Sequence, residues 1–128
     1  MPPHKEVSPA EVREAVLAVG DWIKGQADAP ARARIAAAVR TSARTLGQNA
    51  PGSSVEVRVP PFVAVQCIVG PRHTRGTPPN VVETDALTWL QVVTGIRAFA
   101  DALADGSIDA SGNRAAEVGR WLPLLSIE

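Results

Sequence analysis

The chain has 128 residues, of which 45% are hydrophobic and 20% are charged, and its 13 basic and 13 acidic residues give no formal net charge. This composition is typical of one globular domain and excludes disorder over most of the chain, while the charge balance argues against a dedicated nucleic-acid-binding protein. The single cysteine, Cys67, excludes a disulfide framework and a cysteine-rich zinc site, and fits a reducing compartment.

The first third of the chain predicts two helices. Residues 1–7 look like a disordered arm, and Ser8-Pro9-Ala10-Glu11 has the pattern of a capping box with proline at the first helical position. Apolar residues at helical spacing then predict an N-terminal helix within residues 8–26. A second helix is expected to begin at Pro30 and to end in the polar segment 48–54.

The middle of the chain changes to the period of β-strands. Residues 55–59 alternate between valine and charged residues, which predicts a half-buried strand, and Pro60-Pro61 interrupts it. Residues 62–69 are almost entirely apolar, as expected of a central strand covered on both faces. A polar loop over residues 70–79 then leads to a short strand over residues 80–84.

The last third returns to helical spacing. Thr84 or Asp85 can cap a helix that ends at Gly95, and a shorter helix ends at Gly106. A strand over residues 107–111 and a last helix over residues 114–121, capped by Asn113, complete the order. Because strands and helices are segregated, we predict an α+β sandwich with a mixed or antiparallel sheet of four or five strands packed against helices.

Motifs for known chemistry are missing from the sequence. It has no glycine-rich phosphate loop, no serine-hydrolase elbow and no zinc-protease motif. Cys67 precedes His73 by six positions, but it lies in the most apolar strand, where a free cysteine usually packs as a small hydrophobic residue. We therefore expect no catalytic residue, no cofactor and no metal.

Residues 81–113 carry the most specific pattern. A strand leads into a helix of the form D-x-x-x-W-L-x-x-V-x-G, then a helix with A-x-x-x-G, then a strand that ends in G-N. The pattern comprises Asp85, Trp89, Leu90, Val93, Gly95, Ala102, Gly106 and Gly112-Asn113. It resembles the sterol carrier protein type 2-like family, and R-V-P-P-F-x-A-V-Q-C with G-P-R-H-T-R-G-T-P-P-N looks like its small bacterial single-domain orthologues. The resemblance covers about residues 30–125 and leaves the N-terminal helix as an addition.

The resemblance implies a non-catalytic lipid or sterol carrier with a sandwich fold. Its ligand, a fatty acyl chain or a sterol-like molecule, would lie in an apolar cavity between the sheet and the helices at residues 86–104. The candidate ligand-binding residues are Val63, Val65, Trp89, Leu90, Val93 and Trp121. The alternative is that these side chains simply fill the core, because an alanine-rich sequence leaves small gaps and not one large pocket.

Two other functions stay open at this point. Arg72, His73 and Arg75 place several donors in the 70–79 loop, which suits an anion: a ligand head group, or a small metabolite bound by an enzyme or an enzyme-accessory domain. Glu83 or Asp85 within the protein could occupy the same arginines instead. Third, the WLPLL segment at residues 121–125 or the first helix could dock a protein partner or a second copy of the chain.

No apolar run reaches the roughly 20 residues that span a bilayer, and the first residues lack the apolar core of a secretory signal. We therefore predict one cytoplasmic domain over residues 1–128, with no transmembrane segment and no nucleic-acid partner.

Overall fold

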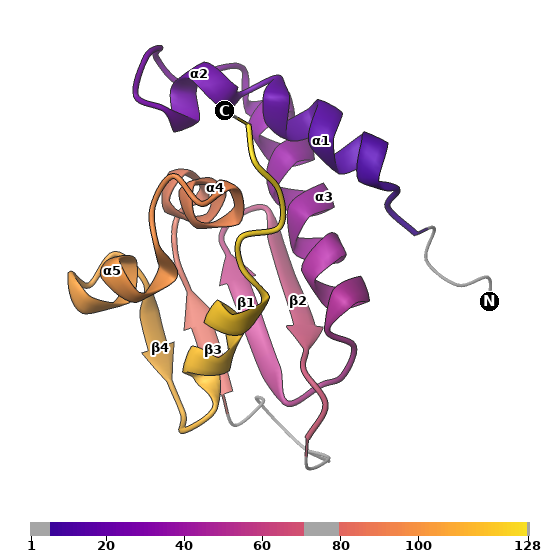
Figure 1. The fold of residues 1–128 in the computed structure, drawn as a ribbon, viewed down its shortest axis with the longest axis vertical. Coiled ribbons are helices and arrows are strands. Elements are labelled where there is room, and N and C mark those ends of the chain that lie inside the picture. The colour runs from indigo at the N-terminus through magenta and orange to yellow at the C-terminus, as the bar shows by residue number, and fades with distance from the viewer. Residues whose placement is uncertain (1–5, 71–79, 128) are drawn as a thin grey trace.

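The computed structural model describes residues 6–70 and 80–127, and Figure 1 shows the arrangement of its elements. Helices α1 (Pro9–Leu17), α2 (Gly20–Ile23) and α3 (Arg32–Asn49) precede strands β1 (Val55–Val59), β2 (Val63–Cys67) and β3 (Asn80–Glu83). Helices α4 (Ala86–Thr94) and α5 (Phe99–Ala104), strand β4 (Asp109–Ser111) and the 3-10 helix η1 (Ala115–Trp121) follow. The predicted α+β fold, with a mixed sheet and an N-terminal helix, is confirmed.

The strands form one sheet in the order β2-β1-β3-β4. Strand β1 pairs antiparallel with β2 and parallel with β3, and β4 pairs antiparallel with β3. Strand β2 therefore lies at an edge, and the prediction of a central strand over residues 62–69 was wrong. The strand looks apolar on both faces in the sequence for two reasons. Val65 on one face packs against Gly47 of α3, and Ala64 on the other face is apolar but exposed.

The pairing register separates an apolar face of the sheet from a polar one. Val57 of β1 is aligned with Val65 of β2 and Val82 of β3, and the valines of β1 are fully buried. Glu56 and Arg58 point to the opposite face, where they form an ion pair. The apolar face is the one that α3, α4 and η1 cover, as their buried side chains in one core with those of β1 and β3 indicate.

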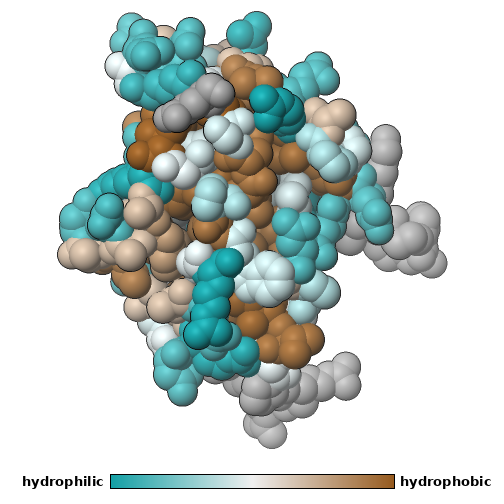
Figure 2. Space-filling view, viewed as in Figure 1, coloured by the Kyte–Doolittle hydropathy of each residue, from teal (hydrophilic) through white to brown (hydrophobic). Residues whose placement is uncertain are grey.

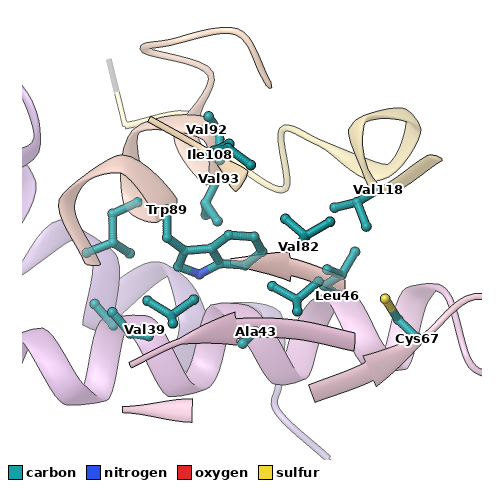
Figure 3. Close-up of a cluster of buried hydrophobic side chains, with 14 of the residues drawn as sticks. Val39, Ala43, Leu46, Cys67, Val82, Trp89, Val92, Val93, Ile108 and Val118 are labelled. Atoms are coloured by element: carbon teal, nitrogen blue, oxygen red, sulfur yellow. The ribbon is translucent and has the colours of Figure 1, made fainter. Parts of the chain in front are cut away.

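Trp89 of α4 is at the centre of the core (Figure 3). Its indole Nε1 donates a hydrogen bond to Oγ of Ser42 in α3 at 2.9 Å, and that hydroxyl donates to the carbonyl oxygen of Ala38 at 2.6 Å. A buried indole N–H needs such a partner, because an unpaired donor in the core is costly. The bond therefore fixes α4 against α3.

The N-terminal helices begin as the sequence predicts and divide where it does not. Ser8 and Glu11 form the expected capping box: the Ser8 hydroxyl accepts from the Glu11 N–H, and the Glu11 carboxylate accepts from the Ser8 N–H. The chain then leaves helical geometry at Val19, which separates α1 from α2. Ahead of α1, Val7 is buried and exchanges two hydrogen bonds with the Gln48 side chain, at 2.6 and 3.1 Å.

The C-terminal segment, residues 122–127, runs from η1 back across α4 to the N-terminal helices (Figure 1). The backbone N–H of Leu124 donates to the carbonyl oxygen of Val93 at 2.7 Å. Farther along, the side chain of Ile127 packs against Gly20, and the Arg13 guanidinium donates to the carbonyl oxygen of Ser126 at 3.1 Å. Residues more than a hundred positions apart are thus in direct contact.

Two further predictions need correction near the C-terminus. The last helix is a 3-10 helix that follows Arg114, not an α-helix capped by Asn113, and β4 begins at Asp109 instead of residue 107. Within η1, Gly119 lies so close to α5 that a side chain there would be 2.8 Å from Cδ2 of Phe99. Local periodicity does not report such a tertiary contact.

Candidate functional site

The space between the sheet and the helices at residues 86–104 is filled by side chains. Trp89, Leu90 and Val93 have no solvent-accessible surface, and neither does Val82 of the facing strand. A side chain with no accessible surface borders no void large enough for a water molecule. A ligand at this predicted position would therefore require the core to open.

The other three candidate ligand residues lie in two further places. Val63 and Val65 are partly buried on edge strand β2, where they line a shallow groove of about 460 Å³ together with Gly47. Trp121 lies at the end of η1 with 42% of its surface exposed, in another groove. The structure thus distributes the six residues over three places and does not bring them together in one site.

An apolar groove lies between α5, the end of α4, η1 and the start of the C-terminal segment; we call it the α5 groove. It has a volume of about 550 Å³, within the range of small-molecule sites. Its lining is mainly apolar and consists of Val92, Gly95, Arg97, Ala98, Phe99, Ala100, Leu103, Ala116, Gly119, Arg120, Leu122 and Pro123. It shares the 86–104 helices with the predicted cavity, but η1 and the C-terminal segment form its other wall in place of the sheet.

Two glycines shape this groove. Gly95 ends α4 in the left-handed conformation, with φ of 75°, as the sequence predicts for a C-terminal glycine. A side chain there would also lie 3.3 Å from Pro123, so the helix end and the C-terminal segment approach closely. Gly119 allows η1 to press against the Phe99 ring. The walls therefore meet where these two glycines leave room for the side chains of Pro123 and Phe99.

The two arginines of the α5 groove differ in their partners. Arg97 forms an ion pair with Asp105 and donates to the Ser107 hydroxyl at 3.0 Å. Arg120 is exposed and makes no hydrogen bond or ion pair within residues 6–70 and 80–127. Arg120 is therefore the guanidinium that is available to an anionic group.

A polar cluster closes the lower end of the sheet. Arg114 donates to Glu117 at 2.8 Å, to the Ser54 hydroxyl at 2.9 Å and to the carbonyl oxygen of Val69 at 2.9 Å, and its backbone N–H donates to Asn80. The hydrogen bond from Arg114 lowers the pKa of Glu117, and the same bond raises the pKa of Arg114. The cluster therefore joins η1 to the first residues of β1 and β3.

The predicted anion-binding residues Arg72, His73 and Arg75 lie outside the described residues, so that hypothesis stays a prediction. Of the two internal partners considered for them, Glu83 is exposed and Asp85 is already engaged. The Asp85 carboxylate accepts from the N–H of Thr88 at 2.8 Å and from its hydroxyl at 3.0 Å, as the cap of α4.

Groups suited to catalysis are not assembled in the described part of the chain. Burial raises the pKa of the Cys67 thiol to about 11, so the thiol is protonated and poorly nucleophilic at neutral pH. No group of three or more His, Cys, Asp or Glu side chains is placed to hold a metal ion within residues 6–70 and 80–127. Nor does any helix over those residues have the length and apolar character needed to cross a membrane.

Sequence reasoning missed most of the α5 groove. For the segments that form this groove, the sequence predicts only a short helix that ends at Gly106 and a candidate partner-binding segment at residues 121–125, and it gives Arg120 no role. The sequence signal for the groove was the set of glycines and the proline at its edges, but their contacts join segments that are far apart in the sequence. Such contacts are not readable from local periodicity.

Together these features define a class: a small α+β domain whose one-sided sheet is covered by helices, with an apolar groove at the surface. The family model described as bacterial SCP ortholog, where SCP denotes sterol carrier protein, matches residues 31–124. The chain belongs to this family. A search of curated proteins found no match. The matched range begins after α1 and α2 and ends before the last contacts of the C-terminal segment.

Proposed function

We propose that this protein is a non-catalytic carrier that holds a long-chain amphiphile, such as a fatty acid, in the α5 groove. The observation that carries the proposal is the groove itself: about 550 Å³ lined mainly by apolar side chains, in a chain of the sterol carrier protein family. Apolar walls favour an alkyl chain, because its removal from water is favourable by about 0.8 kcal/mol per CH₂ group.

The charges around the groove support an anionic head group. Among the described lining residues only Arg97 and Arg120 are charged, and Arg97 is already paired with Asp105. Arg120 can therefore pair with a carboxylate while the chain lies along Phe99 and Leu122. We therefore propose Arg120 of η1 as the residue that binds the head group, and the 70–79 loop stays a second candidate for that role.

The non-catalytic role is supported by the family and by the high pKa of Cys67, the one cysteine of the chain. We also propose a cytoplasmic location, since a free cysteine fits a reducing compartment. Binding of a second copy or of another protein at residues 121–125 stays a prediction.

The test is a substitution that fills the groove without touching the core. Ala100 is exposed on α5 and lines the groove, so Ala100→Trp places an indole in the path of the ligand. Ala37→Trp is the matched control, because Ala37 is exposed on α3 and is not among the described lining residues. Titration with a fluorescent long-chain fatty acid should show equal binding to the wild type and to Ala37→Trp. The affinity of Ala100→Trp should be at least about tenfold lower, which corresponds to a loss of about 1.4 kcal/mol in binding free energy.

Two results would contradict the proposal. Absence of binding to the wild type would exclude the carrier function for this ligand class. Equal affinity of Ala100→Trp and the wild type, with both proteins folded by circular dichroism, would remove the ligand from the α5 groove and return attention to an opened core around Trp89.

A further inference from the structure

Large apolar side chains are exposed at few places in the described residues, and two of them lie together. Leu17, Val69 and Trp121 are 47%, 75% and 42% exposed. Leu17 lies on α1, whereas Val69 and Trp121 line one groove of about 450 Å³ together with Ile68, Ala50 and Pro51. In Figure 2 a hydrophobic area lies beside a strongly hydrophilic strip at the lower front, where η1 and the end of β2 lie in Figure 1.

The backbone holds Val69 in its exposed position. Ile68, a β-branched residue, has φ of 69°, a left-handed conformation that is rare and costly for this residue type. Its N–H donates to the carbonyl oxygen of Ala50 at 2.6 Å, and its carbonyl oxygen accepts from the N–H of Ser54 at 3.0 Å. Gly52 packs so closely that a side chain there would lie 2.1 Å from the Ile68 carbonyl oxygen. The conformation of Ile68, the residue before Val69, is therefore fixed by close backbone contacts.

The charges beside these side chains are unbalanced. Arg114 is fully engaged by Glu117, Ser54 and the carbonyl oxygen of Val69, so Glu117 is neutralised locally. Arg120, next to Trp121 in sequence, has no hydrogen bond or ion pair within the described part of the chain, and it lines both this groove and the α5 groove. Glu117 thus faces two arginines, Arg114 and Arg120, whose charges both lower its pKa, so this surface keeps a local excess of positive charge beside two exposed apolar side chains.

We propose that Val69, Arg120 and Trp121 form a patch that docks the protein reversibly on an anionic lipid surface. Tryptophan favours the membrane–water interface, aliphatic side chains insert into its apolar side, and arginine is attracted to anionic head groups. Because the whole chain has no net charge, attraction to such a surface must come from this local complementarity. Docking does not depend on an occupied α5 groove, so it extends the proposed function without requiring it.

Cosedimentation with phosphatidylcholine vesicles, prepared with and without phosphatidylglycerol, tests this patch. The wild type should bind the anionic vesicles and bind the neutral ones more weakly. Arg120→Glu and Val69→Ser should each lower the partition coefficient about tenfold, as expected for one reversed charge or one lost aliphatic contact. Leu17→Ser and Arg34→Glu are the matched controls, since both change an exposed residue on another helix, and they should bind as the wild type does.

Tryptophan fluorescence supplies a second measurement. Trp89 is fully buried and Trp22 partly buried, so a blue shift on addition of anionic vesicles should come from Trp121 and be absent in Trp121→Phe. If Val69→Ser lowers the melting temperature, the vesicle-binding test still depends on Arg120→Glu, because Arg120 is exposed and its substitution leaves the core unchanged.

The proposal is overturned if the wild type does not sediment with anionic vesicles, or if the two controls lose binding as much as the patch variants do. Vesicle binding by Ala100→Trp separates this proposal from the carrier function. Ala100→Trp should still sediment like the wild type even where it no longer binds fatty acid. Retention of the chain by an acidic partner protein, with no vesicle binding, would assign the patch to protein recognition and would also refute lipid docking.

Discussion

At the scale of single residues, Trp89 shows how a predicted ligand contact can instead be a structural one. Its indole is fully enclosed and donates to Ser42, and described residues have no buried side-chain nitrogen or oxygen atom without a partner. A residue in this position stabilises the fold through both its packing and its hydrogen bond.

Replacement of Trp89 by alanine should therefore lower the free energy of unfolding by about 3–5 kcal/mol, because it leaves a large cavity and removes the hydrogen bond that the Ser42 hydroxyl accepts. Urea denaturation followed by circular dichroism measures the change. Trp121→Ala is the comparison: because the Trp121 side chain is partly exposed, its removal should lower the free energy of unfolding by only about 0.5 kcal/mol. Similar losses for the two variants would show that Trp89 is not part of a closed core.

At the scale of secondary-structure elements, local signals predicted the ends of helices well. The capping box at Ser8 and Glu11, the Asp85 cap and the left-handed Gly95 all depend on residues within four positions of one another. The edge position of β2 and the 3-10 geometry of η1 depend on which elements lie next to them, so periodicity could not predict them. The α5 groove was missed for the same reason.

The turn before β1 gives a sharp test at this scale. Gly52→Ala places a methyl group against the Ile68 backbone and should destabilise the protein far more than Gly25→Ala, which also has a positive φ (76°, against 145° at Gly52) but open space around it, so that its cost is only about 1 kcal/mol. Thermal unfolding of both variants measures the difference. Equal melting temperatures would mean that the Ile68 turn can relax, and that Val69 is not held outward by the fold.

At the scale of the whole molecule, the chain is closed by contacts between its two ends. Ile127 is buried against Gly20, and Arg13 holds the carbonyl oxygen of Ser126. These contacts lie mostly outside the range of the family model, which ends at residue 124. The N-terminal helices and the C-terminal segment thus form one joint addition to the family core.

Ile127→Ala should lower the free energy of unfolding by about 2 kcal/mol, the lower end for a buried isoleucine, because its contacts are near the surface. The exposed Leu17 offers a control of similar size: Leu17→Ala should change stability by less than about 0.5 kcal/mol. Chemical denaturation of both variants measures the free energy of unfolding. An unchanged value for Ile127→Ala would show that the contact between Ile127 and Gly20 contributes nothing to stability.

The same closure determines when the protein can finish folding during its synthesis. Helices α1 and α2 are translated long before residues 126 and 127, yet Gly20 of α2 packs against Ile127, and Arg13 of α1 reaches its partner Ser126 across 113 positions. Until the C-terminal segment has been translated, the emerging chain exposes Gly20 and the backbone of α4 that this segment will cover. We therefore expect this side of the core to stay accessible to chaperones until residues 122–127 have left the ribosome and can pack.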